Sequence, residues 1–222
     1  MNAAARVVQR LDLHVHTAYS HDGFSTPDQF LSACRRRRIT GLAITDHDTI
    51  EGALALQKLL PLTAIVAEEV STRSGHVIGL FLTASIPAGL PVPETITRIR
   101  DQGGLVCIPH PFDRVRSSHI SEAQLDVVAS QIDMVEVFNS RNLFEEANRR
   151  ALAFARAKGR LQTVGSDAHV VGEVGRSYVE MAPFSSSEEF LANLRDARLH
   201  GRRTPLTVRA WIKLRKKLRG IR

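Results

Sequence analysis

The sequence has no long apolar run and contains few cysteines and few aromatic residues. No segment approaches the roughly 18 consecutive apolar residues that a membrane span needs. The opening residues, MNAAARVVQRLDLHVH, have no apolar core of the kind found in signal peptides, so we expect a cytoplasmic protein. Cys34 and Cys107 are the two cysteines, and in that compartment we expect both to be reduced thiols. No repeat, low-complexity tract or linker divides the chain, which predicts a single domain.

The excess positive charge comes from one end of the chain. The net charge is +7, and residues 209–222, RAWIKLRKKLRGIR, hold seven Lys and Arg residues and no acid, so residues 1–208 are balanced. The body therefore gives little indication of a nucleic-acid-binding face. Apolar residues at helical spacing form a stripe in the tail, and we expect this stripe to dock on the body. Binding of RNA, DNA or an anionic membrane surface through the tail is the alternative. The stripe consists of Trp211, Leu214, Leu218 and Ile221.

Strands alternate with helices along residues 1–208. This alternation predicts a mostly parallel sheet with helical crossovers. Six or seven such units favour a closed or nearly closed α/β barrel over a small open sheet. We therefore expect one barrel domain, residues 1–208, followed by a basic tail, residues 209–222. The expected strands are 12–16, 41–48, 62–72, 75–84, 105–111, 133–139 and 161–169, and the expected helices are 26–38, 50–60, 93–104, 122–131, 143–159 and 186–198.

Side chains able to bind metals follow one strand after another. His14 and His16 are two apart on a strand and so share a face, and Asp167 and His169 repeat this spacing. Each cluster alone could be a polar strand face or a capping turn. The carboxyl ends of the strands converge on one mouth in a parallel barrel, so the recurrence predicts a multinuclear metal site. The other strand-end groups are Asp46, His47, Glu68, Glu69, His110 and Glu136.

Eight motifs carry a family resemblance. DLHVHT, YSHDG, ITDHDT, EVST, GHVIGLFL, PHP, EVFN and GSDAH occur in this order, and the chain resembles the PHP (polymerase and histidinol phosphatase) superfamily from about residue 10 to 182. The resemblance implies a distorted seven-stranded β/α barrel, similar to a TIM barrel, with a trinuclear metal centre that hydrolyses phosphoesters. It implies a bridging role between two ions for Glu69, and we expect Glu69, Asp167 and His169 to act in catalysis. The implied metal ligands are His14, His16, Asp22, His47, Glu69, His76, His110, Asp167 and His169.

The number and chemistry of these ligands favour a site that holds several ions. Six imidazoles and three carboxylates are too many for one ion, and a nitrogen and oxygen set without thiolate favours manganese, iron or zinc. Glu68 and Glu69 are neighbours on a strand and face opposite sides, so we expect only Glu69 to reach the mouth. Paired ions polarise a phosphoryl oxygen and lower the pKa of a bound water to about 7, so no separate nucleophile is required.

Arginines beside the mouth are the expected phosphate contacts, because a guanidinium can bind phosphate through two parallel hydrogen bonds. Arg114 and Arg116 follow the PHP motif and Arg141 follows EVFN, although each could instead be a solvated loop residue. We expect Glu136 and Asn139 to orient the ligand residues from behind.

The motif forms are most similar to the stand-alone branch of the superfamily. That branch includes nucleotide phosphatases, nucleoside-bisphosphate phosphatases and exoribonucleases acting on short RNA. We therefore expect a metal-dependent phosphoesterase acting on nucleotides or short oligoribonucleotides through a metal-activated hydroxide. The short segment between His76 and Gly103 leaves no room for the extra subdomain usual in that branch, which predicts a more open site. A histidinol-phosphatase-like small-molecule phosphatase, or a nucleic-acid-associated module with a structural metal site, are the alternatives.

Overall fold

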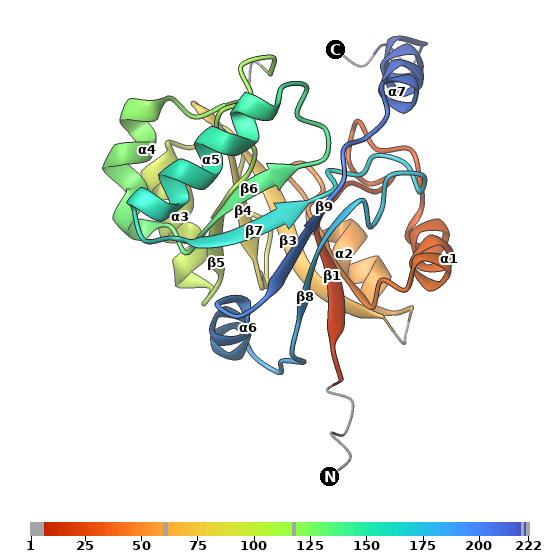
Figure 1. Ribbon diagram of the computed structural model, residues 1–222, viewed down its shortest axis with the longest axis horizontal. Helices are drawn as coiled ribbons and strands as arrows, with labels where there is room; N and C mark the ends of the chain where they lie inside the picture. Colours follow the sequence, from red (N-terminus) through yellow and green to blue (C-terminus); the bar gives the residue numbers. More distant parts are fainter. Residues whose placement is uncertain (1–6, 60–61, 117–118, 219, 221–222) are drawn as a thin grey trace.

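A single curled sheet with helices on its outer side forms the body of the molecule (Figure 1). The computed structural model describes residues 7–59, 62–116, 119–218 and 220. The nine strands are hydrogen-bonded in the order β7-β6-β5-β4-β3-β2-β1-β8-β9, and the expected barrel-like α/β fold is confirmed. No helix in the described ranges combines the length and apolar character needed to cross a bilayer. The strands are β1 (Gln9–Val15), β2 (Gly41–Ile44), β3 (Thr63–Thr72), β4 (Gly75–Leu80), β5 (Leu105–Ile108), β6 (Met134–Asn139), β7 (Leu161–Gly165), β8 (Ser177–Met181) and β9 (Arg198–Gly201).

Apolar and polar residues alternate along β1, and this alternation decides which face of the sheet each side chain occupies. Leu11, Leu13 and Val15 are buried in the apolar core, and Asp12 and His14 point to the opposite face. This second face lines the barrel interior, where β1 delivers its polar residues to the mouth.

Most strands run in the same direction. β4 runs in the opposite direction, and its reversal matters for the site. β1, β2 and β3 are parallel neighbours, as are β5, β6 and β7. β4 is antiparallel to both β3 and β5, and a tight turn joins it to β3, as expected for the segments 62–72 and 75–84. Because β4 runs backwards, its first residues lie at the end of the barrel where the other strands finish. His76 pairs with Ser71 there and so reaches the mouth.

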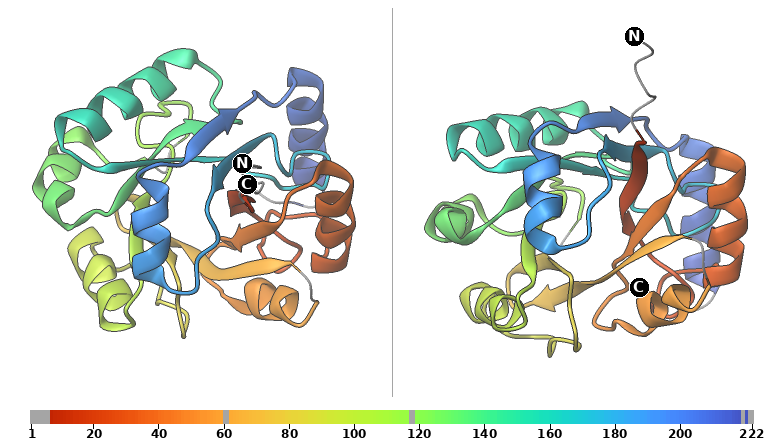
Figure 2. Two further views of the ribbon diagram at one scale, coloured as in Figure 1. Left: turned by 60° about the horizontal axis from the view of Figure 1, so that its bottom comes forward. Right: turned by 90° about the horizontal axis from the view of Figure 1, so that it is seen from below.

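The barrel closes at its mouth where the segment after β7 meets the end of β1. Val15 forms an isolated parallel bridge with Ala168, and the backbone N–H of His16 donates to the Ala168 carbonyl at 2.8 Å. Figure 2 shows the helices arranged around this closed sheet. β8 and β9 then extend the sheet from the free side of β1 as antiparallel strands, which the sequence pattern did not predict.

The helices lie close to their expected positions. Thr26 caps the first one, and its side chain and that of Gln29 form a reciprocal capping box, with Pro27 at the first helical position. The last body helix is shorter than expected, because the chain leaves it after Leu194 and enters β9. The helices are α1 (Pro27–Arg37), α2 (Glu51–Gln57), α3 (Val92–Asp101), α4 (Glu122–Val128), α5 (Glu145–Ala157), α6 (Ser187–Leu194) and α7 (Leu206–Leu218), with a short 3-10 turn η1 (Ala129–Gln131).

The two C-terminal helices lie at opposite ends of the barrel (Figure 1). α6 lies at the end opposite to the mouth, where Phe190 packs against Phe81 and Phe184. α7 lies beside α1 near the mouth, and residues of both helices line one shared surface pocket.

The face by which α7 docks differs from the expected apolar stripe. Trp211, Leu214 and Leu218 are 45%, 56% and 78% exposed, whereas Ile212 is fully buried. Ile221, the fourth residue of the expected stripe, lies outside the described residues. The stripe is exposed because the helix turns the neighbouring side, with Ile212 on it, towards the barrel.

Candidate metal centre

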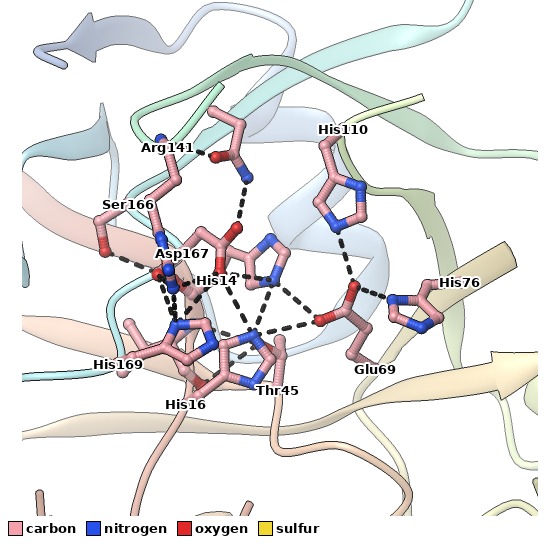
Figure 3. A network of polar contacts seen from close by, with 12 residues as sticks. His14, His16, Thr45, Glu69, His76, His110, Arg141, Ser166, Asp167 and His169 are labelled. Carbon is pink, nitrogen blue, oxygen red and sulfur yellow. Dashed lines mark hydrogen bonds and ion pairs between the residues drawn. The ribbon is translucent and has the colours of Figure 1, made fainter. Parts of the chain in front are cut away.

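The structure brings all nine predicted metal ligands together at the mouth of the barrel. Figure 3 shows the part of this cluster around Glu69 and Asp167. They form five overlapping groups, and within each group one potential ligand atom per residue lies within 4.8 Å of the others. They come from the end of β1 and the loop after it, the segments that follow β2, β5 and β7, the inside of β3 and the start of β4. The groups are His14–His16–Glu69, His14–His110–Asp167, His16–Asp22–His47, His16–Asp167–His169 and His47–Glu69–His76.

Glu69 lies at the centre of the cluster with one imidazole pair at each carboxylate oxygen (Figure 3). Its Oε2 is 3.1 Å from Nε2 of His14 and 3.1 Å from Nε2 of His16. Its Oε1 is 2.8 Å from Nδ1 of His76 and 3.0 Å from Nε2 of His110. A carboxylate so placed can offer one oxygen to each of two neighbouring cations.

The neighbouring Glu68 points to the other side of β3. Its Oε2 accepts a hydrogen bond from the backbone N–H of Ile86 at 2.9 Å, and burial raises the pKa of its carboxyl to about 7. Glu68 therefore has no contact with the cluster, as expected from the alternation of side chains along a strand.

The second half of the cluster is built around the segment after β7. Oδ1 of Asp167 is 3.5 Å from Nε2 of His16 and 3.4 Å from Nδ1 of His169. Nε2 of His169 is 2.7 Å from Oδ2 of Asp22, and Nε2 of His47 is 3.9 Å from the same oxygen. Asp22 and His169 therefore extend the cluster from Glu69 towards the outer rim of the mouth.

Unusual backbone conformations turn two of these side chains into the mouth. His110 and Asp167 have φ values of 31° and 54°, in the left-handed region that non-glycine residues rarely adopt. Each lies just beyond the carboxyl end of its strand. Backbone strain of this kind concentrates at functional sites, where surrounding structure holds it in place.

The cluster fits divalent cations. Oδ1 of Asp167 is buried, has no hydrogen-bond partner among the described residues and lies 3.5 Å from Nε2 of His16. Buried polar atoms are normally paired, so this unpaired oxygen among the imidazoles indicates that the site is built for a further group. Imidazole nitrogens and carboxylate oxygens are ligands for manganese, iron and zinc.

Glu136 and Asn139 support the cluster from behind. Oε1 of Glu136 is 3.0 Å from Nδ1 of His14, and its Oε2 accepts the backbone N–H of His110 at 2.8 Å. Asn139 donates to Glu136 at 2.9 Å and to Asp167 at 3.2 Å. A carboxylate on the far nitrogen fixes the imidazole tautomer, which leaves Nε2 of His14 free to act as a ligand.

Burial and neighbouring charges set the protonation of the cluster together. Burial opposes ionisation of Glu69, but the surrounding imidazoles outweigh it and lower its pKa. Burial likewise opposes ionisation of Asp167, but the charges of Arg116, His14 and Arg141 together outweigh it, so the pKa of Asp167 is also lowered. Burial lowers the pKa of His47 to about 4. The carboxylates are thus ionised and His47 is neutral at pH 7, which are the forms that bind metals.

Two of the three expected phosphate-binding arginines reach the cluster. Arg116 forms an ion pair with Asp167, and its Nε donates to Asp113 at 3.1 Å. Nη1 of Arg141 is 3.8 Å from Oδ1 of Asp167.

Arg114 takes a different direction from the one expected. Its side chain is 75% exposed and lies 3.9 Å from Glu122 on the outer surface. The turn around Asp113 explains the difference, because the backbone N–H of Arg116 bonds back to the Asp113 carbonyl at 3.2 Å. This turn points Arg116 inwards and Arg114 outwards.

Two further contacts at the cluster were not expected from the sequence. Glu173 accepts the backbone N–H of His169 at 2.9 Å. Lys216 of α7 places its Nζ 2.6 Å from Oδ2 of Asp22. Lys216 is four residues after Ile212, so the sequence shows that the two share a helix face. It does not show where that helix docks.

Comparison with known proteins identifies the family. The PHP domain model matches residues 12–84, and the PHP-associated model matches residues 145–199. The uncharacterized protein MJ0417 of Methanocaldococcus jannaschii is 36% identical over 195 residues, which is 82% of this chain and 77% of MJ0417. The chain belongs to the PHP family. The resemblance noted in the sequence is confirmed.

Solved structures share this PHP fold. A two-domain protein from Bacteroides vulgatus, containing a predicted PHP-like metal-dependent phosphoesterase, matches with a TM-score of 0.72 and 17% identity, over 89% of this chain and 66% of that one. The lesion-specific endonuclease PfuEndoQ of Pyrococcus furiosus matches with a TM-score of 0.66 and 16% identity, over 87% and 58% of the two chains. The family and fold are those of PHP-like metal-dependent phosphoesterases, hydrolases acting on ester bonds, and the expected enzyme class is confirmed at this level.

Proposed function

We propose that this PHP protein hydrolyses phosphate esters of nucleotides or short oligoribonucleotides with the help of three divalent ions. The observation that carries the proposal is the position of Glu69, with one imidazole pair at each oxygen. A single structural ion needs only four ligands and a closed shell. Nine convergent ligands around a shared carboxylate support a multinuclear centre with positions left open for substrate and water.

Each side chain has a role that follows from its contacts. When bound, divalent ions supply Lewis acidity and lower the pKa of water to about 7. Glu69, Asp167 and His169 hold the centre together, and Glu136 fixes His14 in the ligand tautomer. Arg116 and Arg141 lie beside Asp167, where they can donate hydrogen bonds to a phosphoryl group.

The side chains of the two cysteines cannot provide an alternative nucleophile. Both are buried, and burial raises the pKa of the Cys34 thiol to about 12 and raises that of Cys107 as well. Neither forms thiolate near neutral pH, which supports a metal-activated water as the proposed attacking group.

A substrate panel tests the proposal. Chelator-treated protein reloaded with Mn²⁺ is assayed on p-nitrophenyl phosphate, AMP, a nucleoside 3′,5′-bisphosphate, histidinol phosphate and a short RNA. We expect hydrolysis of a nucleotide or RNA substrate that is lost in His14→Ala. Hydrolysis of histidinol phosphate alone would assign a small-molecule phosphatase. Inactivity on every substrate with metal bound, together with RNA binding that is lost when residues 209–222 are deleted, would contradict the proposal and favour a binding module.

Metal analysis tests the composition of the centre. We expect about three manganese, iron or zinc ions per chain by plasma mass spectrometry of protein purified without chelator. Glu69→Gln removes the shared ligand and is expected to reduce the count. A single tightly bound ion in the wild type would contradict a trinuclear centre.

The endonuclease fold neighbour suggests a second candidate within the same chemistry. PfuEndoQ is a lesion-specific endonuclease, and this chain carries a basic helix beside its mouth. The substrate panel should therefore also test cleavage of an internal phosphodiester in a nucleic acid strand. A duplex oligonucleotide with an abasic site separates it from release of terminal nucleotides.

A further inference from the structure

Helix α7 presents three residues to the barrel from one face. Arg209, Ile212 and Lys216 are spaced by three and four positions, so they lie along the same side of the helix. Ile212 is fully buried and fixes this side against the body. The two basic residues on either side of it are thereby carried to the mouth, whereas Lys213 and Lys217 are exposed.

Lys216 ends in the ligand cluster itself. Its Nζ lies 2.6 Å from Oδ2 of Asp22, the same oxygen that contacts His169 at 2.7 Å. Asp22 also forms a ligand group with His16 and His47. The ammonium therefore provides positive charge at a carboxylate positioned to coordinate an ion.

An ammonium and a divalent ion cannot both occupy the space in front of one carboxylate oxygen. An ion bound by Asp22 and His47 would repel the ammonium from Oδ2, because like charges a few ångströms apart repel strongly in a buried site. The Lys216 side chain is flexible and α7 stays anchored through Ile212. A negatively charged substrate group at the mouth would then offer the displaced ammonium a new partner.

Arg209 adds to the positive charge on this side of the mouth. Burial and, after it, the charges of Arg141 and Arg116 lower the pKa of its guanidinium, so Arg209 lies within electrostatic range of both arginines. Like charges gathered in this way favour an anionic ligand between them.

We propose that α7 supplies Lys216 as a phosphate-binding residue of this centre, and that its ammonium competes with a divalent ion for Asp22. The inference rests on the proposed phosphoesterase function. The body, residues 1–208, then provides all nine metal ligands, and the tail, residues 209–222, completes the substrate side of the site. An amine tethered in this way is a point charge that suits a phosphoryl group.

Two binding measurements test this role without relying on turnover. The full-length wild type is compared with Lys216→Gln and with the matched control Lys217→Gln, whose side chain lies exposed on the same helix. In Mn²⁺ titrations of chelator-treated protein, we expect Lys216→Gln to bind the ion several-fold more tightly, because the competing ammonium is gone. In calorimetric titrations of Mn²⁺-loaded protein with inorganic phosphate, we expect it to bind about tenfold more weakly.

Lys217→Gln should match the wild type in both titrations. Equal phosphate affinities for the two variants would overturn the inference even if the wild type hydrolyses esters. Tighter Mn²⁺ binding without weaker phosphate binding would also overturn it, because Lys216 would then only block the site. If the proposed function itself is wrong, the outcome is different: the wild type hydrolyses no substrate of the panel.

Discussion

Nδ1 of His14 lies 3.0 Å from Oε1 of Glu136, on the side of the ring that faces away from Glu69. Burial opposes protonation of His14, but Glu136, Asp167 and Glu69 outweigh it and raise its pKa. The ring thus lies between the carboxylates of Glu136 and Glu69. To hold a divalent ion, Nε2 of His14 would have to be unprotonated, and Glu136 would keep the proton on Nδ1.

Replacing Glu136 should weaken metal binding without unfolding the protein. Glu136→Gln offers an N–H to Nδ1 of His14 and favours the tautomer that carries its hydrogen on Nε2, where the ligand lone pair is needed. We expect metal affinity to fall by about 10- to 100-fold. Mn²⁺ calorimetry measures the effect, and Glu146→Gln, which loses only an exposed pair with Arg149, is the control. Unchanged affinity in Glu136→Gln would refute the orienting role.

The two adjacent glutamates of β3 should respond very differently to the same substitution. Glu69→Gln removes the carboxylate shared by both imidazole pairs, so we expect kcat/KM to fall by more than the roughly 100-fold typical of supporting groups. Glu68→Gln alters a side chain on the far face of the strand and should leave kcat/KM within about twofold. Comparable losses in both variants would mean that Glu69 acts through the fold and not as a ligand.

Glu68 also makes stability depend on pH. Its pKa rises from 4.5 to about 7 on burial, so the protonated form is favoured in the folded state. The stability it contributes is fully present below pH 4.5 and is lost as the pH rises through about 7. Because Gln cannot ionise, the melting temperature of Glu68→Gln relative to the wild type should increase from pH 5 to pH 8. Thermal unfolding with chelator present measures this difference, and a constant difference would count against it.

Gly165 is required because two side chains of the site press against it. A Cβ at this position would lie 2.2 Å from Oε1 of Glu136 and 2.4 Å from Cβ of His14. We expect Gly165→Ala to lower the free energy of unfolding by about 1–3 kcal/mol and to weaken metal binding. Gly172→Ala is the control, because its nearest neighbour would be 3.9 Å away. Urea denaturation compares the two, and equal stabilities would show that the site yields to the added methyl group.

Both cysteine thiols should be unreactive in the folded protein. Burial raises the pKa of Cys34 from 9.0 to about 12, with a further contribution from Asp12, so at pH 8 it is protonated and shielded. We expect a disulfide reagent such as DTNB to react with neither cysteine at pH 8 until denaturant is added. Rapid reaction of one thiol in native protein would show that its surroundings open in solution.

The sequence predicts which side chains gather at the mouth, because that information is local to the strand ends. His14 and His16 share a face through the alternation of β1, and His47, His110 and Asp167 each follow a buried strand closely. In a barrel, position at the end of a strand is nearly equivalent to position at the mouth. His76 follows the same rule in reverse, because β4 runs backwards.

Directions within loops and contacts of the tail could not be predicted in the same way. Arg114 and Arg116 are two residues apart in one loop, and only the turn at Asp113 decides which one faces inwards. The helix predicted for residues 186–198 ends early, and pairing of residues 198–201 with β8 makes them a strand that the sequence pattern did not predict. Lys216 contacts Asp22, 194 positions away, because a helix face docks on a surface that the chain builds elsewhere.

Closure of the barrel also dictates when a growing chain can take up cations. His16 bonds to Ala168, and Asp12 accepts the backbone N–H groups of Ser166 and Gly175 at 3.0 and 2.7 Å. These links join segments about 150 residues apart, and such distant pairings form late because the intervening chain must first be ordered. A nascent polypeptide still missing its last third would carry most of the imidazoles without the pocket that unites them. We therefore expect cation uptake to follow closure of the barrel.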